Sequence, residues 1–320
     1  MANLAANSAA QPAPRRSSDY LHLAVIYVVW ASAYLAMKLG VSGPNALSAY
    51  QLQGARLLLG GAVLGLLAWM QGRVARIGLY EFGICAISAL LFWVLGNGFA
   101  MLALRELPSG FVAMAMGTIP LWSAVLQALL TRRLPSTPLT LLLGFGGLVL
   151  ILWPTLAPAG GSLHTSWRTL GALLLAPVAW VIASAMQARL QQRMDGMTAA
   201  SLQLLMGGLM GLLVAWIEYQ PLPAHPSPLT LSALLYLALV GSALSFASYI
   251  KASALFPISV VAAFAYVNPL VSVLLGWLVV NERPAPISLL GMLVVTASVV
   301  VMLNRQRAEQ SARARHTRFS

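Results

Sequence analysis

Residues 256–284 read FPISVVAAFAYVNPLVSVLLGWLVVNERP, and residues 107–135 read LPSGFVAMAMGTIPLWSAVLQALLTRRLP. Shifting the sequence by 149 positions overlays the two segments without a gap and aligns three prolines of each. The aligned pairs are Pro108 with Pro257, Pro120 with Pro269, and Pro135 with Pro284. Each segment is long and apolar enough to cross a bilayer, which takes about 17–25 residues. The overlay therefore predicts an internal duplication of membrane-spanning units.

The composition of the whole chain is that of a membrane protein. Of its 320 residues, 59% are hydrophobic and 8% are charged, and the mean hydropathy is +0.82. A soluble domain carries about 25% charged residues, so this chain lacks the polar groups to cover a water-facing surface. We therefore predict an all-α polytopic membrane protein whose partners are the lipid bilayer and a small-molecule solute. Cys85 is the sole cysteine, so neither a disulfide framework nor a cysteine metal site is expected.

Apolar runs separated by Gly, Pro and charged residues predict ten transmembrane helices. The predicted ranges are 20–39, 47–71, 81–104, 109–130, 138–156, 169–190, 198–217, 229–252, 258–280 and 286–304. The chain then divides into a disordered cytoplasmic leader (1–19), a first five-helix repeat (20–156), a loop (157–168), a second five-helix repeat (169–304) and a basic cytoplasmic tail (305–320).

The basic residues predict an orientation for these helices. With the N-terminus in the cytoplasm, thirteen arginines lie on the cytoplasmic side and four basic residues on the other. The thirteen are Arg15, Arg16, Arg73, Arg76, Arg132, Arg133, Arg189, Arg193, Arg305, Arg307, Arg313, Arg315 and Arg318, and the four are Lys38, Arg105, Arg168 and Arg283. Cytoplasmic loops carry an excess of Lys and Arg, so both termini are predicted to be cytoplasmic. The same bias accounts for the net charge of +12, and nucleic acid is not an expected partner.

An odd number of helices in each repeat places the two repeats in opposite orientations across the membrane. Such inverted repeats, related by a pseudo-two-fold axis in the membrane plane, are the architecture of secondary transporters with alternating access. The alternative is a duplication kept only for stable packing. The second and seventh predicted helices also share small residues at GxxxG spacing, which lets helices approach closely. These glycines are Gly60, Gly61 and Gly65 in one helix and Gly207, Gly208 and Gly211 in the other.

The chain resembles the EamA-type branch of the drug/metabolite transporter superfamily. The resemblance rests on IYVVWASAYLAMKLGV (26–41), ARLLLGG (55–61), GNGFAMLAL (96–104) and ALFPISVVAAFAYVNPLVSVLLGWLVVNERP (254–284), with Glu282 in the turn that ends the last segment. It implies a ten-helix bundle with a central cavity that exports small metabolites or toxic compounds. The first-repeat turn has Arg132 and Arg133 where many relatives carry an acidic residue, so a mirrored gate of paired acids is not expected.

Polar and aromatic residues inside a bilayer tend to face the interior of a helix bundle because lipid contact is costly for them. Trp30 and Tyr34 lie mid-span on one helical face with Tyr27 and Lys38, of which Lys38 is also explained as an interfacial anchor. The residues expected to bind the solute are Trp30, Tyr34, Arg56, Trp93, Asn97, Met114, Thr118, Trp180, Ser184, Tyr249, Tyr266 and Asn268, with Pro120 and Pro269 as hinges.

Some of these residues have a structural alternative. Arg56 lies deep in its predicted span, and no carboxylate occupies the central third of any span. Its partner is therefore backbone, water or an anionic group of the solute, unless it braces the helices at the repeat interface. Serines in the set can equally join neighbouring helices. Tyr266 and Asn268 align with Gly117 and Ile119, so this polar pair is specific to one half and is the favoured contact for solute.

These features predict a secondary transporter that exports amino acids or related apolar and aromatic solutes across the bacterial inner membrane. Glutamates and histidines lie near span ends, in loops or in the tail, and no Walker A motif is present. We therefore expect facilitated diffusion or exchange, without cofactor or metal, by a monomer or weak homodimer. The alternative is a proton-coupled exporter of drugs or toxic compounds. A lipid-modifying enzyme would need a nucleophile–base pair or metal cluster, which we do not find, and a receptor or scaffold would bind without flux.

Overall fold

A computed structural model describes residues 17–73, 77–132, 137–156, 165–256, 260 and 264–319, and every regular element within them is a helix. Most of the predicted leader, most of the 157–168 loop, Pro135 and Pro257 lie outside these residues. The α-helices are α1 (Ser17–Gly40), α2 (Ala49–Met70), α3 (Leu79–Ala89), α4 (Gly98–Glu106), α5 (Ser109–Met116), α6 (Ile119–Thr131), α7 (Pro138–Leu156), α8 (Trp167–Gln191), α9 (Gly196–Ile217), α10 (Pro228–Leu235), α11 (Ser245–Leu255), α13 (Phe264–Val280) and α14 (Pro286–Phe319), and the π-helices are η1 (Leu90–Asn97) and η2 (Tyr236–Leu244).

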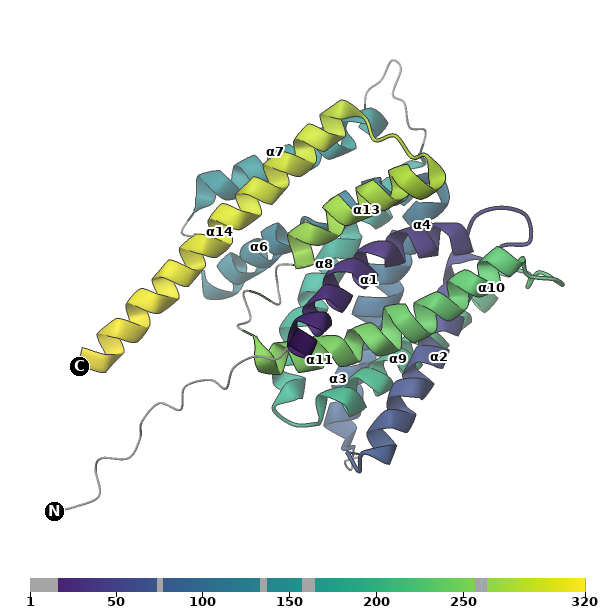
Figure 1. The fold of residues 1–320 in the computed structure, drawn as a ribbon, viewed down its shortest axis with the longest axis horizontal. Coiled ribbons are helices and arrows are strands. Elements are labelled where there is room, and N and C mark those ends of the chain that lie inside the picture. The colour runs from purple at the N-terminus through teal and green to yellow at the C-terminus, as the bar shows by residue number, and fades with distance from the viewer. Residues whose placement is uncertain are drawn as a thin grey trace.

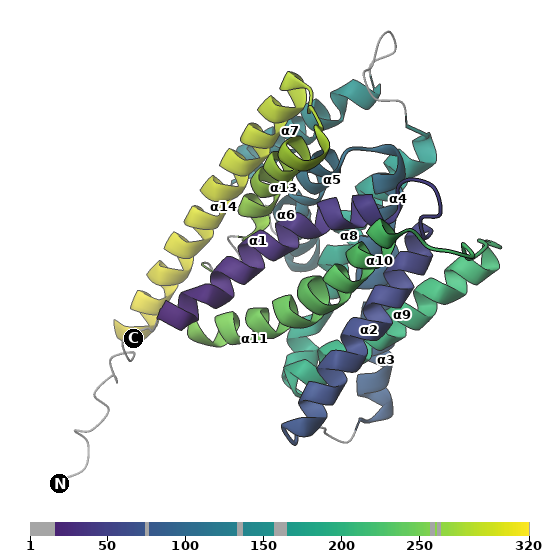
Figure 2. The same cartoon turned by 45° about the vertical axis from the view of Figure 1, so that its right-hand side comes forward.

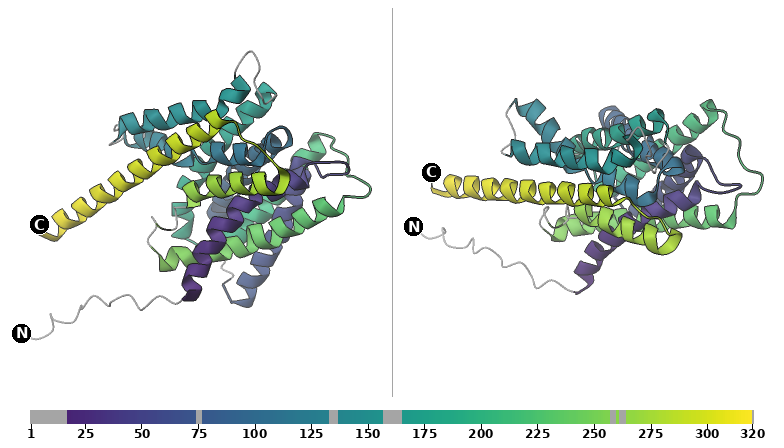
Figure 3. Two further views of the ribbon diagram at one scale, coloured as in Figure 1. Left: turned by 45° about the horizontal axis from the view of Figure 1, so that its top comes forward. Right: turned by 90° about the horizontal axis from the view of Figure 1, so that it is seen from above.

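Within the described residues, nine helical segments are long and apolar enough to cross a membrane. Their ends lie within three residues of nine of the predicted spans. The remaining span, predicted at 258–280, begins outside the described residues, and the part that is described is the shorter apolar helix Tyr266–Val280. In contrast to the predicted tail, α14 continues as one helix to Phe319 (Figure 3), because the tail is rich in the helix formers Ala, Arg and Gln.

The third helix of each half contains a π-helical segment. In the first half, η1 joins α3 to α4, and in the second half η2 joins α10 to α11. A π-helix bonds residue i to i+5 and often occurs at a functional site. The Ser245 hydroxyl donates to the carbonyl of Val240, five residues earlier, over 2.7 Å. In the first half, the π-helical segment η1 ends at Asn97, between Gly96 and Gly98.

The two aligned prolines of the repeat lie in different local structures. In the first half, the helix breaks at Gly117 and Thr118, and Pro120 lies in the first turn of α6, where a proline costs no hydrogen bond. In the second half, Pro269 lies inside α13. The two helices touch at this point, because a Cβ atom on Gly117 would lie 2.8 Å from Cγ of Pro269.

Helices that are equivalent in the two repeats pack along each other in antiparallel fashion. Helix α2 lies along α9 (Figure 1), and a Cβ atom on Gly54 would lie 2.9 Å from the carbonyl oxygen of Gly208. Two turns further along the pair, the Ser201 hydroxyl donates to the Gly61 carbonyl over 2.8 Å. At an offset of 147 positions, Gly54 corresponds to Ser201 and Gly61 to Gly208, so a two-fold rotation exchanges the two contacts.

The same arrangement joins α7 and α14, which lie side by side in Figures 1 and 2. A Cβ atom on Gly147 would lie 2.9 Å from the carbonyl oxygen of Gly291, and the Ser288 hydroxyl donates to the Ile151 carbonyl over 2.9 Å. Increasing residue numbers on α7 thus meet decreasing numbers on α14. Close approach of backbones through small residues is the usual basis of helix association in membranes.

Several helix ends meet at one end of the bundle. Glu282, which follows α13, accepts hydrogen bonds from the backbone nitrogen (2.8 Å) and hydroxyl (2.7 Å) of Ser109 and from the nitrogen of Gly110 (3.3 Å). It therefore satisfies free N–H groups at the start of α5 from the opposite half of the chain. Lys38, near the end of α1, donates to the carbonyls of Leu104 (2.6 Å) and Leu107 (3.1 Å) at the same end.

Ion pairs join helix ends at the opposite end of the bundle. Arg73, after α2, lies 3.6 Å from a carboxylate oxygen of Asp195, before α9. Arg193, after α8, lies 3.5 Å from a carboxylate oxygen of Glu81 at the start of α3. Each of these contacts joins chain segments that the predicted topology places on the same side of the membrane.

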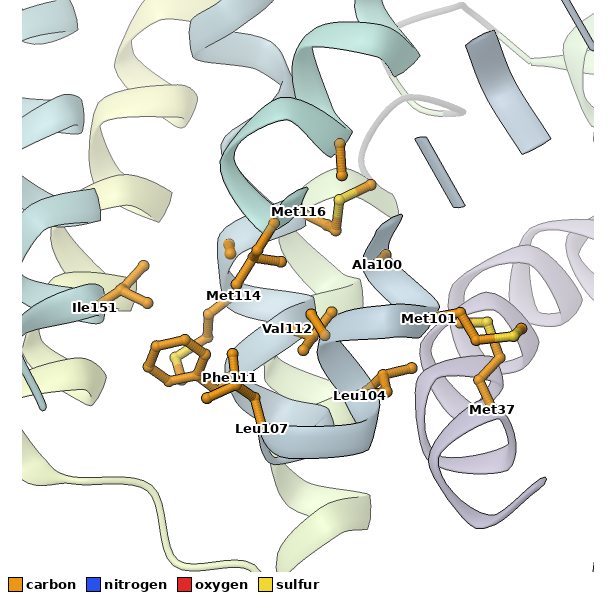
Figure 4. Close-up of a cluster of buried hydrophobic side chains, with 14 of the residues drawn as sticks. Met37, Ala100, Met101, Leu104, Leu107, Phe111, Val112, Met114, Met116 and Ile151 are labelled. Carbon is orange, nitrogen blue, oxygen red and sulfur yellow. The ribbon is translucent and has the colours of Figure 1, made fainter. Parts of the chain in front are cut away.

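The largest hydrophobic cluster fills the space between α1, α4, α5, α7 and α14. Figure 4 shows part of it, in which Phe111 and Met114 from α5 extend toward α7 and Met37 from α1 meets Met101 from α4. Sulfur-containing side chains adapt to irregular gaps. This cluster fixes α5 against the helices that carry the polar site described next.

Candidate functional site

Arg56 is the single charged side chain that is buried within the described chain, with 4% of its surface accessible. Its Nε donates to Oε1 of Gln53 over 2.9 Å, and its Nη2 donates to Oδ1 of Asn97 over 2.6 Å. Gln53 in turn donates to the carbonyl of Trp93 over 3.0 Å. The arginine network, as we call Gln53, Arg56, Trp93 and Asn97, thus joins the middle of α2 to the π-helix η1.

All partners of Arg56 in this network are neutral. Its hydrogen bonds use Nε and Nη2. Nη1 makes no hydrogen bond within the described chain, and it keeps some accessible surface. The two ion pairs of the described residues, Arg73–Asp195 and Arg193–Glu81, lie at the end of the bundle. The guanidinium charge is therefore held in the interior without a carboxylate from the part of the chain that the structure describes, which is costly at membrane depth.

Aromatic side chains surround the arginine network. Tyr34 from α1 lies deep in the bundle, within electrostatic range of Arg56, yet keeps part of its surface accessible. The Trp180 ring from α8 packs edge-to-face against Trp93, with ring centroids 6.0 Å apart, and against Phe92 at 4.9 Å. Five predicted site residues from four helices are thus brought together: Tyr34, Arg56, Trp93, Asn97 and Trp180.

A second aromatic cluster joins α1 to the other half. Trp30 packs against Tyr249 of α11, with centroids 5.5 Å apart, and edge-to-face against Phe264 of α13 at 4.8 Å. The Asn268 amide, with its nitrogen turned toward them, donates to the carbonyls of Phe264 and Tyr27, each at 3.2 Å. Asn268 therefore ties α13 to α1, which is a structural use of a residue predicted to contact solute.

Met114 and Tyr266 line a small cavity between α5, α13 and α14. The cavity walls are Met114, Gly117, Tyr266, Pro269, Met292, Val295, Thr296 and Val299. The predicted hinge at Pro269 thus borders an open space next to the break between α5 and α6. Thr118 does not face this cavity, because it is fully buried and its hydroxyl donates to the carbonyl of Ala115 over 2.6 Å.

Ser184 is separate from both clusters. It is exposed on α8, and its hydroxyl donates to the carbonyl of Trp180 over 2.8 Å, a bond within the same helix. A serine that back-bonds to its own helix needs no partner from a neighbour. The structure therefore does not bring Ser184 to the other predicted site residues.

Two functional candidates were missed by the sequence analysis. Gln53 is fully buried and lies one helical turn before Arg56, so the spacing i, i+3 was a signal that could have found it. Gln203 occupies the position of Arg56 in the second repeat, since LQLLMGG (202–208) aligns with ARLLLGG (55–61). It donates to the Ser88 hydroxyl over 2.6 Å and exchanges hydrogen bonds with Gln187 at 2.9 and 3.3 Å.

The helices, their antiparallel pairing and the polar groups enclosed between them define a polytopic α-helical membrane protein of the transporter class. The chain belongs to the EamA-like transporter family, whose model matches residues 19–153 and again residues 167–304. This family is part of the drug/metabolite transporter superfamily, as the resemblance in the sequence implied.

Two relatives of the chain have transporter names, and a third is named as WAT1-related. It is 28% identical to the "Uncharacterized inner membrane transporter YedA" of Escherichia coli over 88% of this chain and 89% of that protein. It is 26% identical to the "Uncharacterized transporter YvbV" of Bacillus subtilis over 88% of this chain and 92% of the relative. A WAT1-related chloroplastic protein of Arabidopsis thaliana is 25% identical over 86% of this chain and 67% of its own length.

The fold also matches a solved structure, titled only as a crystal structure of protein. The TM-score is 0.59 at 19% sequence identity, and the match covers 90% of this chain and 96% of the other. This likeness supports the fold alone. The family match, with the inner membrane transporter relative, identifies the chain as a multi-pass membrane transporter.

Proposed function

We propose that the protein is a secondary transporter of ten transmembrane helices, in two inverted five-helix repeats, that exports small metabolites by alternating access. The observation that carries this proposal is the antiparallel contact of α2 with α9 and of α7 with α14. Equivalent helices meet in this way when an axis in the membrane plane relates two repeats of opposite orientation. The enclosed aromatic and polar residues are the proposed solute-binding site.

The proposed topology has both termini in the cytoplasm of a bacterial inner membrane. Loop contacts support it, since Glu282 binds Ser109 at one end of the bundle while Arg73 binds Asp195 at the other. In the proposed topology, thirteen basic residues belong to the loops at the second of these ends or to the tails, and positive-inside bias assigns that end to the cytoplasm. The name of the YedA relative gives the same membrane.

We propose facilitated diffusion or exchange as the mode of transport. Proton relays in membrane transporters usually use Asp, Glu or His side chains within the bilayer. Here Glu81, Glu106 and Glu282 lie at helix ends, where they bind loop or helix-terminal groups. A transmembrane pH gradient that alone drives concentrative uptake into proteoliposomes would replace this mode with the alternative, proton-coupled export.

Solute counterflow in proteoliposomes tests the proposal. Proteoliposomes that contain the purified protein are preloaded with one unlabelled member of a panel of amino acids, nucleobases and drugs. Uptake of the same compound, labelled and added outside, is then measured. Acceleration by at least one compound supports transport. Saturable binding of a compound without any counterflow would make the protein a receptor, and would contradict the proposal.

Two substitutions connect the transport to the proposed site. Trp30→Ala and Tyr266→Ala should each lower the counterflow rate about fivefold to tenfold, because each removes an aromatic wall of the site. Trp153→Ala is the matched control, because Trp153 lies on α7 with 51% of its surface exposed. The amount of monodisperse protein after size-exclusion chromatography must be equal for all variants. Normal rates in both site variants would remove these residues from the solute pathway.

A further inference from the structure

Arg56 carries a positive charge that no carboxylate of the described residues pairs with. Its two hydrogen-bond acceptors, Gln53 and Asn97, are neutral amides. The acidic side chains of the described helix ends and loops are engaged elsewhere, as with Glu282 at Ser109 and Asp195 at the start of α9. An uncompensated buried charge is strongly destabilising, so a group that brings negative charge to Arg56 would be favoured there. The site is therefore built for an anionic partner.

The geometry of the guanidinium indicates the kind of anion. Arginine presents a planar fork of N–H groups that matches a carboxylate in bidentate fashion. Arg56 is held in place by Gln53 and Asn97 through Nε and Nη2, so its Nη1 group and the remaining N–H of Nη2 are the donors left for a ligand. Tyr34 of α1, which keeps accessible surface and lies within electrostatic range of Arg56, contributes a hydroxyl to the surroundings of the guanidinium.

The surroundings of the site indicate the rest of the ligand. Trp93 of the arginine network forms an edge-to-face pair with Trp180, and Phe92 packs against the same Trp180 ring. Such walls suit a flat apolar body. No carboxylate of the described chain lies at the arginine network, so an ammonium group of a solute would find no counter-charge there.

We infer that Arg56 binds the carboxylate of the solute. The protein then recognises amphipathic organic anions, and an amino group on the solute is not required. This inference rests on the proposed transport function and narrows its substrate class. It differs from recognition of a zwitterion, which would need a negative group beside Arg56. The Gln203 position of the second repeat, which is neutral, does not offer a second receptor of this kind.

Matched probes test this inference in detergent-solubilised full-length protein. The probes are 3-phenylpropanoate and hexanoate, their amine counterparts 2-phenylethylamine and pentylamine, and L-phenylalanine. The readout is the ligand-induced rise in melting temperature, titrated to give an apparent Kd at neutral pH. We expect at least one carboxylate to bind about tenfold or more tightly than its amine counterpart, which is the strength of a charge-assisted hydrogen bond. Binding of neither carboxylate, or equal binding of acid and amine, would overturn the inference.

Two variants separate recognition from folding. Arg56→Gln copies the residue at the equivalent position of the second repeat and should weaken carboxylate binding about tenfold or more. Asn97→Asp places a carboxylate 2.6 Å from the Arg56 guanidinium, so it should raise the melting temperature of the free protein while weakening the same binding. Unchanged carboxylate binding in a folded Asn97→Asp protein would contradict the inference even if Arg56→Gln fails to fold.

The outcomes for transport and for recognition are distinguishable. Carboxylate binding that depends on Arg56 but never yields counterflow would sink the transporter proposal and leave the receptor assignment standing. The opposite outcome is counterflow of a neutral nucleobase such as uracil that Arg56→Gln does not change, in a protein that binds no carboxylate. It would support the transporter proposal and contradict the assignment of Arg56 as a carboxylate receptor.

Discussion

Helices α2 and α9 are equivalent in packing and different in charge. They approach each other through the same small residues, and the Gly54–Gly208 contact on one side has its mate in the Ser201–Gly61 contact on the other. Two positions after Gly54, however, α2 carries Arg56, whereas two positions after the equivalent Ser201 α9 carries Gln203. Arg56 binds Asn97 of η1, whereas Gln203 binds Ser88 of α3 and Gln187 of α8.

The difference shows which part of the duplicated fold is shared and which part is specialised. Packing through glycine depends on shape, and shape must be similar in both halves for the equivalent helices to fit each other. A buried charge depends on what it binds, and one ligand site needs only one such charge. The symmetric contacts therefore belong to the scaffold, and the asymmetric polar residues belong to recognition.

The largest expected effect is on the shared scaffold. Gly147→Leu should remove most of the folded protein, at a cost of about 3 kcal/mol or more, because even its Cβ atom would lie 2.9 Å from the Gly291 carbonyl oxygen. Gly146→Leu is the adjacent control, since nothing lies within 4 Å of a Cβ atom there and the residue is exposed. The yield of monodisperse protein after size-exclusion chromatography is the measurement. Equal yields for both variants would show that α7 and α14 do not pack as described.

The next largest effect is expected when the second repeat is given an arginine at the position that corresponds to Arg56. Gln203→Arg should destabilise the protein by about 2.5–3.5 kcal/mol, the cost of a charge at the centre of a membrane helix, because Ser88 and Gln187 offer no anion. Adding Ser88→Asp supplies a carboxylate where Gln203 now donates over 2.6 Å, and should recover part of the loss. Thermal melting of the single and double variants measures both effects. A single variant as stable as the parent would mean that this region is hydrated and not specialised as neutral.

The smallest effect concerns a second asymmetry, at the helix cap. Glu282 caps α5, but the aligned first-repeat residue is Arg133, for which this role is impossible. Glu282→Gln should lower stability by about 1 kcal/mol, because it removes the charge from a helix N-terminus but keeps one acceptor oxygen. Glu218→Gln is the control, since Glu218 is exposed and accepts a hydrogen bond from Gln220. Melting temperatures that shift equally in the two variants would argue against the cap.

The sequence predicted the transporter class, the family and nine helical segments to within three residues. It could do so because hydropathy and loop charge respond directly to the bilayer, and because the aligned prolines marked the duplication. It also named Arg56 and Asn97 as site residues. That they bind each other was not predictable, because the contact joins residues 41 positions apart through a fold not yet known.

The π-helices and the break between α5 and α6 were beyond prediction for a different reason. No residue pattern in the sequence marks a π-helix, and the helices that pack against it decide where it forms. Pro120 and Pro269 align in sequence, yet one begins a helix and the other lies inside one. Local sequence allowed both structures at both positions, and tertiary packing selected between them.

The cap on α5 has a consequence for biogenesis. The carboxylate of Glu282 and the N–H groups that it binds at Ser109 are separated by 173 residues of chain. At a synthesis rate of about 5–20 residues per second, α5 leaves the ribosome about 10–35 seconds before its cap exists. Throughout this interval α5 has no cap, and α7 also has no partner, because α14 follows Glu282 in the chain. The two halves therefore mature as one unit in the membrane, although the duplication gives each of them the look of a separate domain.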